Sequence, residues 1–165
     1  MTEFLAVYNE DDVLLDEKID RKDRETIEND KYFRIVIVFI QNSRNEFLIQ
    51  KVPVHKGDCF ATTGGHVQYN VSSLDTIVSE VEEELGTTVV KEEFQLIATN
   101  KRWPIFQDVY YLKKDIDISK LTLQETEVVS VEWMSIDKIK KVIEKGQLRK
   151  SNIEAFKQVL ENITK

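Results

Sequence analysis

The sequence predicts a single domain that combines strands and helices, as an α/β or α+β sandwich. Apolar residues run together over short segments in the first part of the chain and recur at helical spacing later. The resulting order is strands, helix, strands, helices, which is typical of a sheet covered by helices. The length of 165 residues fits one sizeable core, so residues 1–165 are expected to form one domain.

Strands are predicted to fill most of the first third of the chain. A short strand is expected over Phe4–Tyr8, and after a turn residues 13–15 return beside it. The densely charged stretch 16–31 is expected to be a solvated loop or a frayed helix. Residues 32–40 are β-branched or aromatic almost throughout, which predicts a strand buried on both faces. Residues 46–50 are expected to form its returning partner.

The clearest helix is expected over residues 73–85. Ser72 and Asp75, three residues apart, resemble the start of a capping box, and Gly86 is placed to end the helix. Its buried face is predicted from apolar residues at helical spacing, which are Leu74, Ile77, Val78, Val81 and Leu85. The helix should therefore be anchored on the core along this face.

Three further strands and two helices are predicted after this helix. The strands are expected over residues 87–99, 105–112 and 128–133. Ser135 is expected to cap a short helix that Gly146 ends. Ser151 and Glu154 form a second capping box, which predicts the start of the last helix.

The composition argues against a membrane protein, a secreted protein and a non-specific nucleic-acid binder. The longest apolar run, residues 35–40, is far shorter than the roughly 20 residues that cross a bilayer. The first residues show no basic stretch followed by an apolar segment, so no signal peptide is expected. Cys59 is the only cysteine, which excludes an internal disulfide and favours the cytoplasm. A net charge of −7 lacks the basic footprint that nucleic acid requires.

Acidic residues near the end of the predicted helix indicate chemistry. At about 100° per residue, Glu80, Glu83 and Glu84 fall within roughly a 100° arc beside the apolar face. Like charges at these spacings destabilise a helix slightly, and a cation between them removes that cost. Mg²⁺ takes carboxylate oxygens together with water and phosphate oxygens. An acidic run alone is more often a solvated face than a metal site, so the surrounding motif decides.

The segment from Gly65 to Gly86 resembles the Nudix box, G-x5-E-x7-R-E-U-x-E-E-x-G-U, in which U is aliphatic. Gly65 matches the first glycine, and the second half is matched at the correct spacing by Glu80, Val81, Glu83, Glu84 and Gly86. Val71 and Ser79 stand where the box has Glu and Arg, and Thr87 replaces the last aliphatic residue. Other segments are similar to Nudix proteins related to isopentenyl diphosphate isomerase, namely residues 4–11, 46–51 and 127–135.

This resemblance implies a Nudix-type α/β/α sandwich with a mixed central sheet. It also implies an Mg²⁺- or Mn²⁺-dependent hydrolase that cleaves the diphosphate linkage of a nucleoside diphosphate-type or related organic diphosphate. By similarity, Glu80, Glu84 and the Gly64 carbonyl are expected as metal ligands. Glu83 is expected to hold metal-bound water or to move a proton, with a supporting role as the alternative. The implied partner is a small diphosphate, and a homodimer is left open.

Four more residues are candidates for the site. Asp108 lies where the related isomerase has an essential acidic residue, so it is a candidate general base, with a surface position on an edge strand as the equal alternative. His66 adjoins the double glycine and is expected to be a hydrogen-bonding residue for substrate, although the isomerase has a metal ligand there. Arg102 could meet phosphate, and Trp103 could form an aromatic wall, but solvated surface and ordinary packing are the more common roles.

Other functions compete with hydrolysis. Because two box positions are altered, a catalytically weak or inactive ligand-binding module is the main alternative. Isomerase chemistry is disfavoured because Gly64 stands where that reaction uses a cysteine and Phe106 replaces an acidic ligand.

Two further acidic residues are weaker candidates for the general base. Glu125 and Glu127, which lie near a loop, rank behind Asp108. The double glycine itself predicts a tight turn or a close backbone approach.

Overall fold

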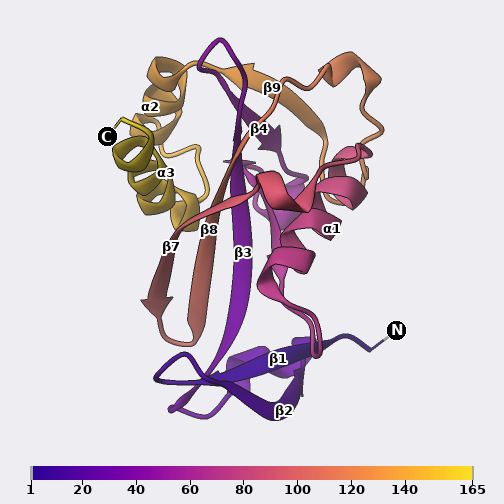
Figure 1. Ribbon diagram of the computed structural model, residues 1–165, viewed down its shortest axis with the longest axis vertical. Helices are drawn as coiled ribbons and strands as arrows, with labels where there is room; N and C mark the ends of the chain where they lie inside the picture. The colour runs from indigo at the N-terminus through magenta and orange to yellow at the C-terminus, as the bar shows by residue number, and fades with distance from the viewer. Residues whose placement is uncertain (1, 165) are drawn as a thin grey trace.

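A mixed sheet of nine strands carries helices on both faces in the computed structural model, which describes residues 2–164 (Figure 1). The strands are β1 Phe4–Asn9, β2 Leu14–Asp20, β3 Lys31–Gln41, β4 Phe47–Lys51, β5 Phe60–Ala61, β6 Thr63–His66, β7 Gln95–Arg102, β8 Ile105–Lys113 and β9 Ser130–Met134. The helices are α1 Ser73–Leu85, α2 Ile136–Glu144 and α3 Lys150–Ile163, with short 3₁₀ helices at Arg21–Thr26, Val54–Lys56, Lys91–Glu93 and Ile118–Lys120. The predicted sandwich with a mixed sheet is confirmed.

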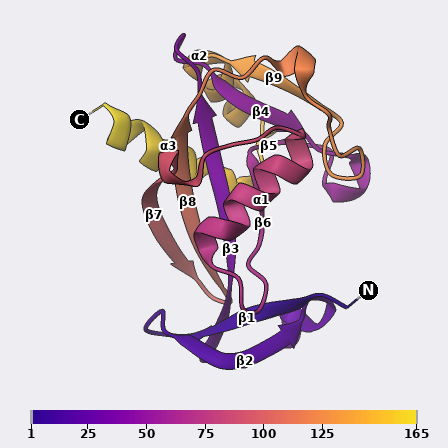
Figure 2. The same ribbon diagram turned by 45° about the vertical axis from the view of Figure 1, so that its right-hand side comes forward.

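The central strand is β3. It runs antiparallel to β1, β4 and β6 and parallel to β8, with Phe33 opposite Ile105 and Gln41 opposite Lys113. The β1–β2 hairpin lies across one end of β3 (Figures 1 and 2). The prediction that this strand is buried on both faces is confirmed, because its apolar side chains contribute alternately to two cores.

Each face of the sheet has its own core. On one face, α1 packs through Ile77, Val81 and Leu85 against β3 and β8. On the other face, α2 and α3 cover the sheet, and Phe39, Phe47 and Phe156 meet with ring centroids 5.3 to 6.3 Å apart. Figure 2 shows α1 in front of the sheet and α3 behind it. Among residues 2–164, no helix is both long and apolar enough to cross a bilayer.

The ends of α1 are where the sequence predicts them. The backbone N–H of Asp75 donates to Ser72 Oγ at 3.1 Å, which caps the first turn. Gly86 has a φ of +65° and its N–H donates to the Glu82 carbonyl oxygen, which ends the helix. A Cβ on Gly86 would also lie 2.4 Å from the Thr122 carbonyl oxygen. The register of the acidic residues on α1 is therefore set from both ends.

The expectation of a loop or frayed helix over 16–31 is wrong. Residues Leu14–Asp20 form β2, and only 21–26 form a short 3₁₀ helix. Leu15 and Ile19 share one face of β2 and pack on the apolar cluster under the hairpin, while the charged residues face outward. Charged edge strands are common because they resist pairing with other chains. Of the three apolar residues of β2, only Leu15 and Ile19 pack inward, so the charged residues hid the period of two.

Two other boundaries differ from the prediction. The strand expected over 87–99 begins only at Gln95. The last helix begins at Lys150, so Ser151 lies within its first turn instead of capping it. The reason is tertiary pairing: the Arg149 N–H donates to the Phe60 carbonyl oxygen at 2.8 Å and keeps the preceding chain extended. The capping-box prediction at Ser151 is therefore wrong.

The cap of α1 can be tested by replacing Ser72 with alanine. Ser72→Ala removes the acceptor for the Asp75 N–H, so we expect the free energy of unfolding to fall by about 1 kcal/mol in urea denaturation. Ser79→Ala is the matched control, because Ser79 is exposed on the same helix. Equal effects of the two substitutions would show that the cap contributes nothing specific.

Candidate active site

The double glycine lies in a strand and not in a turn. β6 is antiparallel to β3, with Gly64 opposite Ile37 and Gly65 opposite Val36. A Cβ on Gly64 would lie 2.4 Å from the Val36 carbonyl oxygen, and a Cβ on Gly65 would lie 2.4 Å from Cδ and Oε1 of Glu80. Of the two predicted alternatives, the close backbone approach is confirmed. β6 is thus in tight contact with β3 through Gly64 and with a carboxylate of α1 through Gly65.

Two of the three predicted carboxylates come together beside this strand. Glu80 and Glu84 lie one turn apart on α1, and Glu84 is only 5% exposed. Burial raises the pKa of both carboxyl groups, and a hydrogen bond between them raises the pKa of Glu84 further. Glu83, which the sequence places on the same arc, is exposed to solvent.

A neighbouring amide holds Glu84 in place. Gln50 on β4 is 2% exposed, and its Nε2 donates to Glu84 Oε1 at 3.2 Å. The Thr63 hydroxyl donates in turn to Gln50 Oε1, which fixes the orientation of the amide. Sequence reasoning missed Gln50. The available signal was a single polar residue at the end of the apolar run of the predicted strand over 46–50.

A divalent cation fits the pair formed by Glu80 and Glu84. Neither carboxylate forms an ion pair with a Lys, Arg or His of the described residues 2–164, although Glu84 is buried and Glu80 is half-buried. Mg²⁺ is commonly held by one or two carboxylates, with waters and phosphate oxygens as its other ligands. Within 2–164 no group of three His, Cys, Asp or Glu side chains is arranged to hold a metal. The fit therefore rests on two carboxylates.

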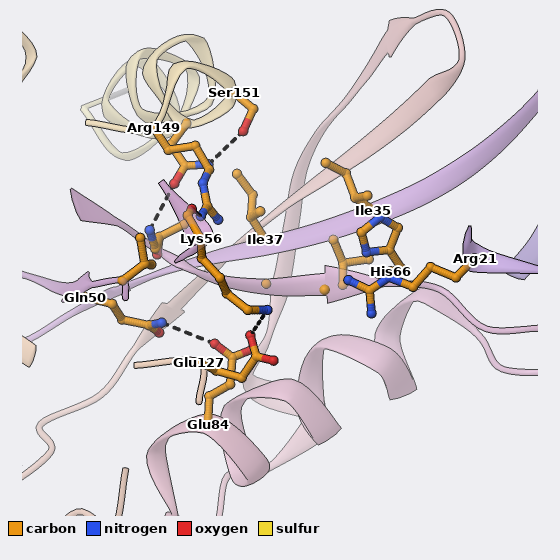
Figure 3. Close-up of a pocket in the computed structure, with 16 residues that line it drawn as sticks. Arg21, Ile35, Ile37, Gln50, Lys56, His66, Glu84, Glu127, Arg149 and Ser151 are labelled. Atoms are coloured by element: carbon orange, nitrogen blue, oxygen red, sulfur yellow. Dashed lines mark hydrogen bonds and ion pairs between the residues drawn. The ribbon is translucent and has the colours of Figure 1, made fainter. Parts of the chain in front are cut away.

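A pocket of about 330 Å³ opens beside Glu84 (Figure 3). Gly64 and Gly65 line it, together with the acidic residues Glu84 and Glu127. Its other polar and charged residues are Arg21, Gln50, Lys56, Thr62, His66, Arg149, Ser151 and Asn152. The pocket therefore places cationic side chains near the carboxylates, an arrangement suited to a ligand that carries phosphate.

His66 lies in this pocket in an uncharged form. Its ring stacks on Phe33 with centroids 5.8 Å apart. Burial, with the positive charges of Arg21, Arg24 and Lys56, lowers the pKa of His66 to about 3. At neutral pH the imidazole is therefore neutral and can offer a hydrogen bond. Its contact with substrate stays a prediction.

Asp108 lies elsewhere, in a buried ion pair. Its Oδ1 accepts from Arg34 Nη1 at 2.6 Å and from Thr99 Oγ1 at 2.8 Å, and Oδ2 accepts from Ser73 Oγ. The alternative of an edge strand is wrong, because β8 lies between β3 and β7. Asp108 is 4% exposed and is not among the residues that line the pocket.

Arg102 and Trp103 are also apart from the pocket lining. They stand at the hairpin between β7 and β8, where both are exposed. The structure does not bring them together with Glu80 and Glu84. Their part in substrate binding stays a prediction. The cations that do line the pocket are Arg21, Lys56 and Arg149, which sequence reasoning missed because each lies in a charged or loop-like stretch.

Residues 31–157 match the NUDIX domain family. The chain belongs to this family. It is 27% identical over 117 residues to an uncharacterised Nudix hydrolase of Listeria innocua, covering 68% of this chain and 69% of that protein. The fold is similar to that of a Deinococcus radiodurans protein, with a TM-score of 0.75 and 21% identity over 92% of this chain and 94% of that one. A MutT structure, from work on the Aliivibrio salmonicida and Vibrio cholerae proteins, has a TM-score of 0.65 and 26% identity over 79% of this chain and 98% of that one.

These similarities confirm the Nudix resemblance and the Nudix fold. Family membership and the likeness to a Nudix hydrolase support an enzyme of the pyrophosphohydrolase class. The narrower resemblance, to the branch related to isopentenyl diphosphate isomerase, stays a prediction.

The two glycines of β6 should respond differently to a methyl group. In Gly64→Ala the new Cβ meets a backbone carbonyl, so we expect unfolding free energy to fall by about 1–3 kcal/mol. In Gly65→Ala it meets the end of the flexible Glu80 side chain, so we expect a smaller loss of stability but weaker Mn²⁺ binding. Urea denaturation and Mn²⁺ titration would measure the two effects. A Gly65→Ala variant with unchanged metal affinity would contradict the assigned contact.

The role of Asp108 can be separated from catalysis by comparing stability with turnover. Asp108→Asn leaves Arg34 without its buried anionic partner, so we expect a loss of about 3 kcal/mol in unfolding free energy. We also expect the folded variant to keep kcat within about threefold. Asp137→Asn, at an exposed position of α2, is the control. Normal stability with a large loss of kcat would instead assign Asp108 to the chemistry.

Proposed function

We propose that this protein hydrolyses the diphosphate linkage of a nucleoside diphosphate-type or related organic diphosphate, with Mg²⁺ or Mn²⁺ as cofactor. The observation that carries the proposal is the carboxylate pair of buried Glu84 and half-buried Glu80, beside a pocket that also contains cationic side chains. The carboxylates suit a divalent cation, and the cationic side chains suit phosphate oxygens. A metal-dependent reaction at a diphosphate needs both groups, the carboxylates for the metal and the cationic side chains for the phosphate oxygens.

The residues of the chain have distinct roles in this proposal. Glu80 and Glu84 would hold the metal, with the Gly64 carbonyl as a further oxygen ligand. When bound, such a metal neutralises charge on phosphate oxygens and lowers the pKa of a water molecule. Gln50 keeps the Glu84 carboxylate oriented through its hydrogen bond. Glu83, which is exposed next to Glu84, would hold metal-bound water or act in proton transfer.

The general base is proposed to be an acidic residue near the carboxylate pair. Glu83 lies on α1 beside Glu80, and Glu127 lines the pocket with Glu84. Asp108 fits this role less well, because both of its oxygens already accept hydrogen bonds. We therefore place Glu83 first and Glu127 second as proton acceptors.

A catalytically weak or inactive binding module is the second candidate. Val71 and Ser79 replace the Glu and Arg of the box, and both side chains are exposed. Neither replacement leaves a charged partner buried and unpaired, so the fold can persist with a reduced rate. In that case the pocket would bind a diphosphate compound without turning it over.

Location and partners are proposed from the sequence. Cys59 is a free, half-buried thiol, which fits the reducing cytoplasm. A small diphosphate is the proposed partner, without nucleic acid or membrane. A homodimer stays open.

The decisive experiment is phosphate release from a panel of nucleoside diphosphate derivatives, nucleoside triphosphates and isoprenoid diphosphates. We expect turnover with Mg²⁺ or Mn²⁺, none with EDTA, and a fall in kcat/KM of about 100-fold or more in Glu84→Gln. Glu82→Gln is the control on the same helix, since its amide oxygen can still accept from the Val89 N–H. It should keep normal activity.

The same experiment separates the two candidate functions. Binding of a diphosphate compound by calorimetry, with no turnover in any metal, would favour the binding module. Turnover that persists unchanged in EDTA would contradict the metal-dependent mechanism.

A further inference from the structure

The pocket contains an ion pair that competes with an anionic ligand. Lys56 Nζ pairs with the Glu127 carboxylate, and both residues line the pocket with Arg149 (Figure 3). We propose that Lys56 and Arg149 bind the diphosphate group of the substrate, and that binding transfers the Lys56 ammonium from Glu127 to a phosphate oxygen. The identity of the ligand as a diphosphate rests on the proposed function.

Lys56 can exchange Glu127 for another anionic partner. Their side chains are 31% and 35% exposed, so water screens the attraction and the pair contributes little to stability. Lys56 ends a short 3₁₀ helix at Val54–Lys56, and Glu127 lies in the loop before β9. A diphosphate offers more negative charge and more acceptor oxygens than one carboxylate. It can therefore replace Glu127 as the partner of Lys56.

Arg149 places a second cationic side chain close to Lys56. Its Nη2 donates to the backbone carbonyl oxygen of Lys56 at 3.1 Å, which ties the loop of Lys56 to the start of α3. No carboxylate among residues 2–164 pairs with Arg149, and a guanidinium has five N–H donors. The remaining donors are available to a phosphate. Nearby, Asn152 is fixed because its Oδ1 accepts from the Thr62 N–H at 2.9 Å.

Arg21, the third cationic side chain of the pocket, already has an acidic partner. Arg21 lines the pocket, but its Nη1 also pairs with Glu3 at 3.1 Å. We therefore assign the primary phosphate contacts to Lys56 and Arg149.

The rest of the lining favours recognition through phosphate groups. Its apolar part consists of Ile35, Val36, Ile37 and Val52, and the described lining residues include no Phe, Tyr or Trp. Among the described lining residues, His66 has a ring on which a base could stack, and that ring already stacks on Phe33 with centroids 5.8 Å apart. The charged contacts therefore provide most of the selectivity.

The test is a double-mutant cycle on binding, with methylenediphosphonate as a probe that cannot be hydrolysed. Affinity is measured by calorimetry in EDTA, so that neither turnover nor metal is involved. We expect Lys56→Met and Arg149→Met each to weaken binding by about tenfold, because each removes a cation from the site. We expect Glu127→Gln to tighten binding by about threefold or more, because Lys56 is then free for the probe.

The double variant distinguishes exchange from simple repulsion. In the Lys56→Met background, Glu127→Gln should change the affinity by less than about twofold, since no ammonium is left to release. An equal gain in both backgrounds would show that Glu127 only repels anions, and would overturn the exchange. Absence of binding in the unaltered protein would overturn the binding site itself.

A matched ion pair outside the pocket serves as the control. Lys138 Nζ lies 2.5 Å from Glu132 Oε2, and these side chains are 53% and 41% exposed. Lys138→Met and Glu132→Gln should leave probe affinity unchanged. Urea denaturation of every variant confirms folding. If the protein binds the probe but shows no turnover, the proposed hydrolysis is contradicted and the binding site is retained. If the protein is active but Lys56→Met and Arg149→Met leave probe affinity unchanged, the binding site is contradicted and the proposed hydrolysis is retained.

Discussion

The contact between Gly65 and the Glu80 carboxyl group is the constraint on which the site depends. Because Gly65 has no side chain, α1 lies close enough to β6 for Glu80 to rest on the strand backbone. One turn later, Glu84 reaches the amide of Gln50 on β4. A methyl group at this one position would collide with the end of the Glu80 side chain and displace its carboxyl group from the strand. The spacing of glycine and glutamates in the sequence is therefore a requirement of packing between helix and strand.

A second contact fixes the opposite end of α1. The Ser73 hydroxyl donates to Asp108, which pairs with Arg34 on the adjacent strand β3. The Arg34 guanidinium also pairs with Asp12 and lies over the rings of Tyr8 and Phe106, at 4.4 and 5.1 Å from their centroids. This buried network joins the first hairpin, the sheet and the helix. The network gives Asp108 a structural role, because both oxygens of its carboxyl group already accept hydrogen bonds there.

Local signals in the sequence were sufficient for α1, whereas the Glu80 and Glu84 pair required the family resemblance, because helical spacing alone placed Glu83 on the same arc. Caps, apolar spacing and the glycine pair act within about 20 residues of each other, so they can be read directly. The pocket cations could not be found this way. Arg149 reaches the pocket only because its backbone pairs with Phe60, far away in the sequence. The position of Asp108 depended likewise on the parallel pairing of β3 with β8, which no local pattern specifies.

Arg21 lines the pocket from a part of the chain that the family match does not cover. The family match covers residues 31–157, whereas Arg21 begins the 3₁₀ helix Arg21–Thr26 that follows β2 and precedes that region. One lining residue of the pocket thus comes from outside the matched region, while the carboxylates and the glycine contact lie within it. A substitution at Arg21 would alter the lining of the pocket without touching the network of Asp12, Arg34 and Asp108 that reaches α1. This cationic part of the lining is therefore separate, along the chain, from the carboxylates of α1.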